Sequence, residues 1–236
     1  MDASGLTLNR STIEERNSKL YYTRVLYLLL AVQLGLVLMW THWLAKHANG
    51  TLGRVLSHWG LTLALGLVCL LLVLFCYFLS IVRRDPINWV IYVLFTALFT
   101  LFVGSLATRD STGLMRFVLW VLFLVAIALF LYFLVAETYI SSLNEVLLIL
   151  GVAGLVLLSF LALTDVQPWK LALGLVIAVA VAFFISYQHR AMIRNSLWDL
   201  GREDPVTGAV RVWFDGLLGF CRIGELFTKG FGRFAI

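Results

Sequence analysis

Residues 117–136 read FVLWVLFLVAIALFLYFLVA, a stretch with no charged or amide side chain. An apolar run of about 18 residues or more is long enough to cross a bilayer as a helix. Working outward from this stretch, comparable runs predict seven transmembrane helices, at 22–43, 59–82, 87–107, 115–136, 145–164, 169–188 and 209–228. The sequence therefore predicts an all-α polytopic membrane protein embedded in a lipid bilayer.

The composition excludes a soluble fold. Of the 236 residues, 61% are hydrophobic and 13% are charged, whereas soluble domains carry about 25% charged residues. Residues 1–20 are polar and contain acidic side chains, unlike a cleavable signal peptide, so the first helix is expected to direct insertion. We expect a polar tail (1–21), a membrane domain (22–228) and a short C-terminal tail (229–236). The net charge of +5 comes without a long basic run, so nucleic acid is not an expected partner.

Loop residues give the expected boundaries and orientation. Pro86 and Pro168 each follow a polar break and suit the first turn of a new helix. Lysine and arginine are more numerous on the side that carries the N-terminus, which predicts a cytosolic N-terminus. Asn49-Gly50-Thr51 is a glycosylation sequon in the first outside loop. If 209–228 were a re-entrant segment instead of a spanning one, the excess of lysine and arginine on the side of the N-terminus would be larger.

The last apolar segment contains the ionisable residues that stand out most. Asp215 lies within Val212–Phe220, where an ionisable side chain costs about 3 kcal/mol or more at the centre of a membrane helix. Arg211 precedes it by one turn, and Arg222 and Glu225 follow close to one helical stripe. These three side chains could also lie near an interface and extend to it. Asp215 is too deep for that, and it predicts an ion or proton path.

Other reactive side chains form no recognisable catalytic set. The cysteines are predicted to pack as small apolar residues, and the four histidines are predicted to lie at the interface. Glu137, Glu145, Asp110 and Asp165 are predicted to be solvated loop charges. Neither a zinc hydrolase, a rhomboid-type protease nor a retinal protein fits the spacing. We therefore expect no enzymatic activity and no cofactor.

Short motifs along the whole chain, in order, resemble the transmembrane BAX inhibitor motif family (the Bax inhibitor, Lifeguard and Golgi anti-apoptotic proteins). They are Arg24–Leu34, Arg83–Asn88, Phe95-Thr96, Val103-Gly104, Trp213-Phe214-Asp215, Phe220 and Leu226-Phe227. The resemblance implies six helices around a central seventh, and a calcium leak that also inhibits cell death in eukaryotic hosts. It implies an endomembrane (ER or Golgi) location in a eukaryotic or viral setting and the inner membrane in a bacterium.

Three positions depart from the family pattern. Tyr187 stands where the family places a second Asp, which pairs with the aspartate of the last helix as a pH-sensitive latch. Phe99 and Leu218 replace an acidic residue and an Asn. The chain thus retains half of the latch, and this divergence resembles that of viral seven-helix relatives, some of which alter host-cell surface proteins.

Two functional hypotheses follow from these residues. The first is a slow leak for Ca²⁺ or another cation past Asp215, which would bind Ca²⁺ transiently, with Arg211 or Arg222 as its counter-charge and Tyr187 as a hydrogen-bond partner. The second is a non-conducting protein that binds other membrane proteins and regulates their survival signalling, trafficking or degradation. A small-solute transporter lacks the expected broken helices and repeat symmetry.

Overall fold

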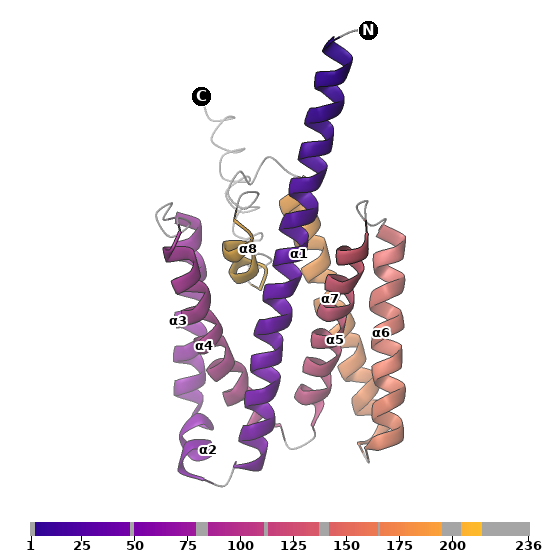
Figure 1. The fold of residues 1–236 in the computed structure, drawn as a ribbon. Helices are drawn as coiled ribbons and strands as arrows, with labels where there is room; N and C mark the ends of the chain where they lie inside the picture. Colours follow the sequence, from indigo (N-terminus) through magenta and orange to yellow (C-terminus); the bar gives the residue numbers. More distant parts are fainter. Residues whose placement is uncertain are drawn as a thin grey trace, which may run out of the picture.

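The computed structural model describes residues 3–47, 50–78, 85–110, 113–136, 142–164, 166–194 and 204–213. Within these ranges the chain is helical and contains no strand. The helices are α1 (Ala3–Lys46), α2 (Thr51–Leu56), α3 (Trp59–Phe78), α4 (Ile87–Ala107), α5 (Leu114–Val135), α6 (Ser142–Leu163), α7 (Pro168–Arg194) and α8 (Pro205–Arg211). Figure 1 shows the long helices running side by side as a bundle.

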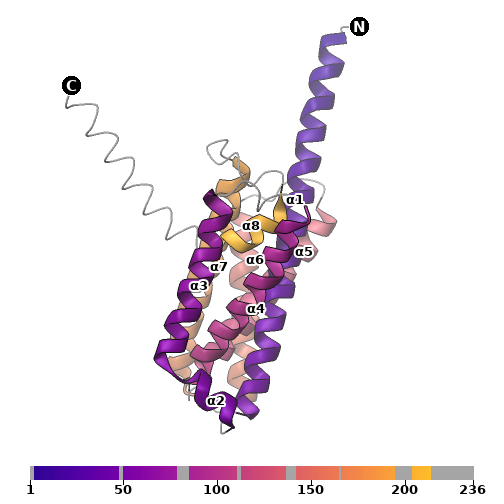
Figure 2. The same ribbon diagram turned by 90° about the vertical axis from the view of Figure 1, so that its left-hand side faces the viewer.

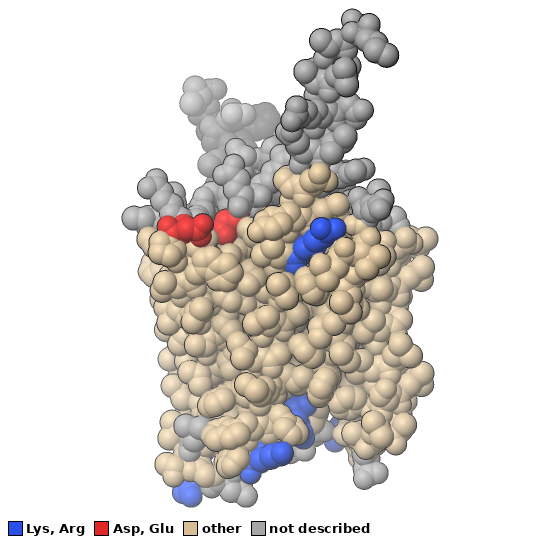
Figure 3. Space-filling view, in the orientation of Figure 1, with Lys and Arg blue, Asp and Glu red and all other residues tan. Residues whose placement is uncertain are grey.

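Six of these helices are long and apolar enough to cross a membrane: α1, α3, α4, α5, α6 and α7. They coincide with the first six predicted segments, so the multi-pass membrane prediction is confirmed. In the face shown in Figure 3, a broad band without visible lysine, arginine or acidic side chains separates two charged ends. Most of the seventh predicted segment, 214–228, lies outside the described residues, so its spanning and its central position stay predictions.

Prolines mark two helix starts as predicted. Pro86 occupies the N-cap position of α4, and Pro168 is the first residue of α7. Proline suits these places because its missing N–H would have no partner in the first helical turn. Two features were not predicted, namely α2 in the first loop and the extension of α1 through the polar N-terminal region.

Among the described helices, α1 is the central one. In its membrane stretch 56% of the most apolar window is buried, against 17% for α6. It packs against α4 on one side and α5 on another, and α8 lies among α1, α3 and α4 (Figures 1 and 2). Its Leu26, Leu30 and Leu34 are almost completely buried. The cysteines of α3, Cys69 and Cys76, are buried in the core, in agreement with their predicted packing role.

Candidate functional site: two polar clusters beside α1

The first cluster is built around Glu145 in the first turn of α6. Its side chain is 1% exposed. One carboxylate oxygen, Oε2, accepts a hydrogen bond from Arg190 Nε of α7 at 2.7 Å and forms an ion pair with the same guanidinium. The other oxygen, Oε1, accepts from Ser186 Oγ and, at 3.4 Å, from Tyr27 Oη of α1. Glu145 therefore joins the start of α6, the end of α7 and the middle of α1.

His189 continues this cluster between α7 and α1. Its ring is fully buried, with Nε2 3.0 Å from Thr23 Oγ1 and Nδ1 3.5 Å from Tyr27 Oη. The Thr23 hydroxyl already donates to the Lys19 carbonyl, so its oxygen is the acceptor for an N–H at Nε2. The Tyr27 hydroxyl lies between His189 and Glu145. We call Thr23, Tyr27, Glu145, Ser186, His189 and Arg190 the Glu145 cluster.

Arg24 lies next to this cluster and closes the end of α5. Its guanidinium donates to the carbonyls of Phe133 at 2.6 Å, Ala136 at 3.3 Å and Leu134 at 3.5 Å. The last carbonyls of a helix have no partner within the helix, and basic side chains commonly satisfy them. Arg24, the first residue of the family-like motif, therefore fixes α1 to α5.

The second cluster begins where the chain enters α8. Asp204 caps this helix, because its carboxylate accepts from the Val206 N–H at 3.0 Å and from the Thr207 hydroxyl. Asn88 Nδ2 of α4 donates to the same carboxylate at 3.2 Å. These hydrogen bonds hold the start of α8 against the start of α4.

From that anchor the chain runs into the interior of the bundle. Val206, Ala209 and Val210 are buried. A Cβ added at Gly208 would lie 2.2 Å from Tyr22 Oη, so only glycine allows the tyrosine of α1 to lie against α8 in this way. Arg211 is 1% exposed and lies near Tyr22 and Cys76.

The described part of the seventh segment ends at Trp213, whose indole N–H donates to Gln33 Oε1 at 2.8 Å. Gln33 Nε2 donates in turn to Thr96 Oγ1 of α4 at 3.4 Å. Gln33 lies near the middle of the membrane stretch Asn17–Lys46, and Thr96 lies near the middle of Ile87–Ala107. Trp213 is thereby held close to the mid-depth of the bundle. We call Asn88, Asp204, Thr207, Gln33, Thr96 and Trp213 the α8 cluster.

The predicted site residues divide into those the structure places and those outside its described ranges. Asp215, Arg222, Glu225 and the sequon residue Asn49 lie outside them. Tyr187 is 69% exposed on α7, and no hydrogen bond in the described ranges joins it to the described part of the seventh segment. Its pairing with Asp215 stays a prediction.

Two predictions about the Glu145 cluster were wrong. Glu145 was predicted to be a solvated loop charge and His189 an interfacial histidine, yet both are buried. The other three histidines, His42, His47 and His58, are exposed, as expected near an interface. The useful signal was the Ser186–His189–Arg190 spacing, which places three polar side chains close together at the end of a helix that neighbours Glu145.

Several residues that carry the family resemblance contact one another or another helix. Arg24 and Gln33 belong to the first motif, Asn88 and Thr96 to the next two, and Trp213 to the motif Trp213-Phe214-Asp215. Comparisons with protein-family models, with curated proteins and with solved structures find no match for this chain.

Proposed function

We propose that this chain is a Bax-inhibitor-like membrane protein that lets Ca²⁺ or another cation pass slowly along a path that includes Asp215. The observation that carries the proposal is the Trp213–Gln33 hydrogen bond at mid-depth in the bundle. Asp215 follows Trp213 by two residues, which is at most about 7 Å of extended chain. A carboxylate so close to the bilayer centre is costly unless it faces a polar partner or water.

The partners of this part of the chain support the same depth. Asp204 contacts Asn88 at the start of α4, and α8 then lies across the bundle (Figure 2). The Trp213 ring lies deeper, where its indole N–H donates to Gln33 and its ring centroid is 4.9 Å from that of Phe99 of α4.

Arg211 gives the proposed path its low conductance. The guanidinium is buried, and Arg211 precedes Asp215 by four residues. A fixed positive charge on a cation path raises the barrier for permeation and can neutralise the carboxylate by pairing with it. One carboxylate with a counter-charge makes a weak Ca²⁺ site, since Ca²⁺ takes six to eight oxygen ligands. A slow leak fits these residues better than a selective channel.

The test is Ca²⁺ flux into liposomes that contain the purified protein, compared between the native chain and Asp215→Asn. The proposal predicts flux above that of empty liposomes and a clear change on substitution. Folded protein without flux would refute it.

A specific observation favours a second candidate, a non-conducting interaction protein for other membrane proteins. In the described part of the chain, both oxygens of the buried Glu145 carboxylate are engaged by protein donors. Apolar side chains of α6, including Leu143, Leu155 and Leu158, are more than half exposed and face outward from the bundle. If the chain is such an interaction protein, a photo-crosslinker at Leu155 of α6 should capture specific membrane proteins. The same crosslinker at Met39 of α1 is the control position.

A further inference from the structure

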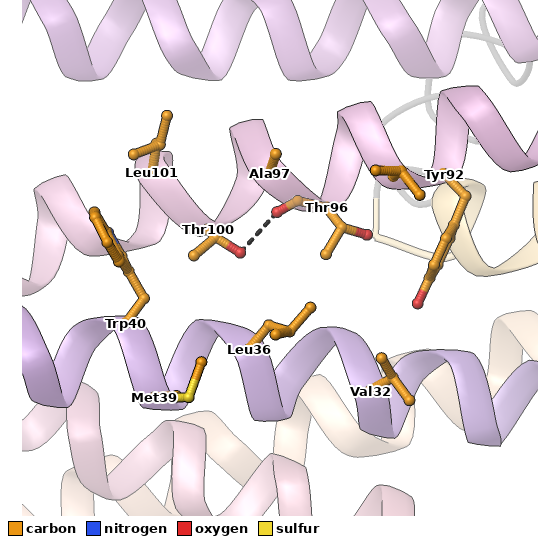
Figure 4. Close-up of a pocket in the computed structure, with 10 residues that line it drawn as sticks. Val32, Leu36, Met39, Trp40, Tyr92, Thr96, Ala97, Thr100 and Leu101 are labelled. Atoms are coloured by element: carbon orange, nitrogen blue, oxygen red, sulfur yellow. Dashed lines mark hydrogen bonds between the residues drawn. The ribbon is translucent and has the colours of Figure 1, made fainter.

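An apolar groove lies between α1 and α4 on the outside of the bundle. It has a volume of about 550 Å³ and runs from Val32 to Trp40 along α1 and from Tyr92 to Leu101 along α4. Figure 4 shows side chains of the two helices facing each other across it. Met39 and Val93 at its edges are 66% and 63% exposed, so the groove opens to the surroundings of the bundle.

The groove has the length of one bilayer leaflet. From Val32 to Trp40 α1 rises about 12 Å, and from Tyr92 to Leu101 α4 rises about 13 Å. One leaflet contributes about 15 Å of hydrocarbon. Val32 lies near the middle of the α1 membrane stretch, and Trp40 lies toward its end at Lys46. Tyr92 lies about 6 Å beyond the mid-depth residue Thr96, on the side of the N-terminus. The groove therefore crosses the mid-depth of the bundle, and most of its length lies in the leaflet opposite the N-terminus.

The hydroxyl groups that line the groove are already hydrogen-bonded within the protein. Tyr92 Oη donates to the Leu29 carbonyl at 2.7 Å, and Thr100 Oγ1 donates to the Thr96 carbonyl at 2.7 Å. Thr96 Oγ1 accepts from Gln33. These hydroxyls leave no strong demand for a polar ligand, so the chemistry of the groove suits a hydrocarbon chain.

The outer end of the groove leads to an aromatic and basic surface. The exposed stripe Val32, Leu36, Met39 and Trp43 continues at helical spacing to Lys46, which is exposed. The Trp43 ring stacks on Trp40 and His47, with ring centroids 5.1 and 4.6 Å apart. Such aromatic clusters typically lie at the level of lipid headgroups.

Charge at this end favours an anionic group. The described charged residues of this end are cationic apart from one carboxylate, and Figure 3 shows lysine and arginine side chains along it. The cations are Lys46, Arg54, Arg109, Arg116 and Lys170. The one carboxylate, Asp110, is engaged by the Met115 N–H at 2.6 Å.

We propose that this groove binds one acyl chain of a membrane phospholipid, with the phosphate of that lipid beside Lys46. The hydrogen-bonded hydroxyls of the groove and the cationic, aromatic surface at its outer end favour a phospholipid over a partner helix, which would offer no phosphate to Lys46. The inference is independent of ion conduction.

The test counts the phospholipids that remain on the protein when it is released from phosphatidylglycerol-containing detergent micelles in a native mass spectrometer. Ala97→Phe fills the groove, since Ala97 lines it, and Ala172→Phe adds the same ring at an exposed site on α7. We expect one phospholipid on the native chain and on A172F, and about tenfold weaker retention by A97F because the apolar contact is lost. Equal retention by A97F and the native chain, or equal loss in both variants, would overturn the proposal. A change from dimer to monomer in A97F, with phospholipid retention unchanged, would instead identify an interface between two copies.

A second pair of variants tests the phosphate contact without touching the groove. Lys46→Gln is expected to weaken phosphatidylglycerol retention several-fold, whereas Arg116→Gln at the same end leaves it unchanged. Both side chains are exposed, so neither variant endangers folding. If A97F does not fold, equal retention by K46Q and R116Q would by itself reject the proposed site.

Discussion

Glu145 is a single buried carboxylate that holds several helices together in this protein. A buried charge costs several kcal/mol unless it is paired and its remaining lone pairs are hydrogen-bonded. Glu145 meets that requirement through Arg190 on one oxygen, and Ser186 and Tyr27 on the other. Because its partners come from α1 and α7, the residue holds the start of α6 and the end of α7 against α1.

A double-mutant cycle measures this ion pair. Glu145→Gln keeps the shape and the bond to Ser186 but removes the charge, and we expect it to destabilise the protein by about 2 kcal/mol. Arg190 is 28% exposed, so Arg190→Gln should cost less, because Glu145 keeps other donors. The double variant should recover about 1 kcal/mol relative to the sum. Thermal or denaturant unfolding in detergent checks this, and strictly additive losses would show that the pair contributes no coupling.

At the residue scale, sequence reasoning succeeded where burial is local and failed where it depends on distant partners. Cys69 and Cys76 lie in one apolar run, so their packing role could be predicted. Glu145 stands at the edge of an apolar run, where a charge is normally solvated. Its burial follows from the meeting of the α6 start with the α7 end, which no single segment reveals.

At the scale of elements, α8 is the helix that the pattern of apolar residues predicts least well. It is only seven residues long, yet it is buried, capped by Asp204 and begun by Pro205. Short helices of this length are not stable alone, so α8 depends on its contacts with α1, α3 and α4. One of these contacts places Gly208 against Tyr22 of α1.

Gly208→Ala should weaken the packing of α8. The new methyl group would overlap the hydroxyl of Tyr22, which is 3% exposed and has little room to move. We expect a loss of about 2 kcal/mol, partly rescued by Tyr22→Phe, which removes that hydroxyl. Gly154→Ala in α6 is the control, because no atom lies within 4 Å of its added Cβ, and alanine is favoured over glycine in a helix. Equal unfolding temperatures for G208A and G154A would contradict the packing described here.

Long helices were predicted closely and short ones were not. The segment 87–107 coincides with α4, because Pro86 and the polar residues before it interrupt the apolar run clearly. The polar half of α1 and the six-residue α2 carry no strong apolar signal, so hydropathy could not predict them.

At the scale of the whole molecule, α1 connects the two polar clusters. One face of α1 carries Thr23 and Tyr27 toward the Glu145 cluster, while Gln33 contacts α4 and Trp213. The chain meets the start of α4 at Asp204, and the Trp213 ring reaches Gln33 near mid-depth. The predicted seventh helix, 209–228, would carry the chain from there to the other surface of the membrane.

The two termini should therefore lie on opposite sides of the membrane. Single cysteines at Ser4 and Ala235, in a chain otherwise free of cysteine, can be labelled with a membrane-impermeant maleimide in sealed, oriented vesicles. We expect only one of the two to react before the vesicles are opened. Labelling of both from the same side would mean that the seventh segment turns back inside the bundle.

Calcium flux through purified protein in liposomes tests the central claim most directly. The native chain, Asp215→Asn and the control Asp85→Asn, whose side chain is exposed in the turn before α4, would be compared over a pH series. We expect flux above empty liposomes for the native chain and for D85N. It should decline as acid protonates the carboxylate and change at least several-fold in D215N, because the substitution removes the proposed charge on the path. Equal flux from D215N and the native chain, or none from folded protein, would contradict the account and favour the interaction protein.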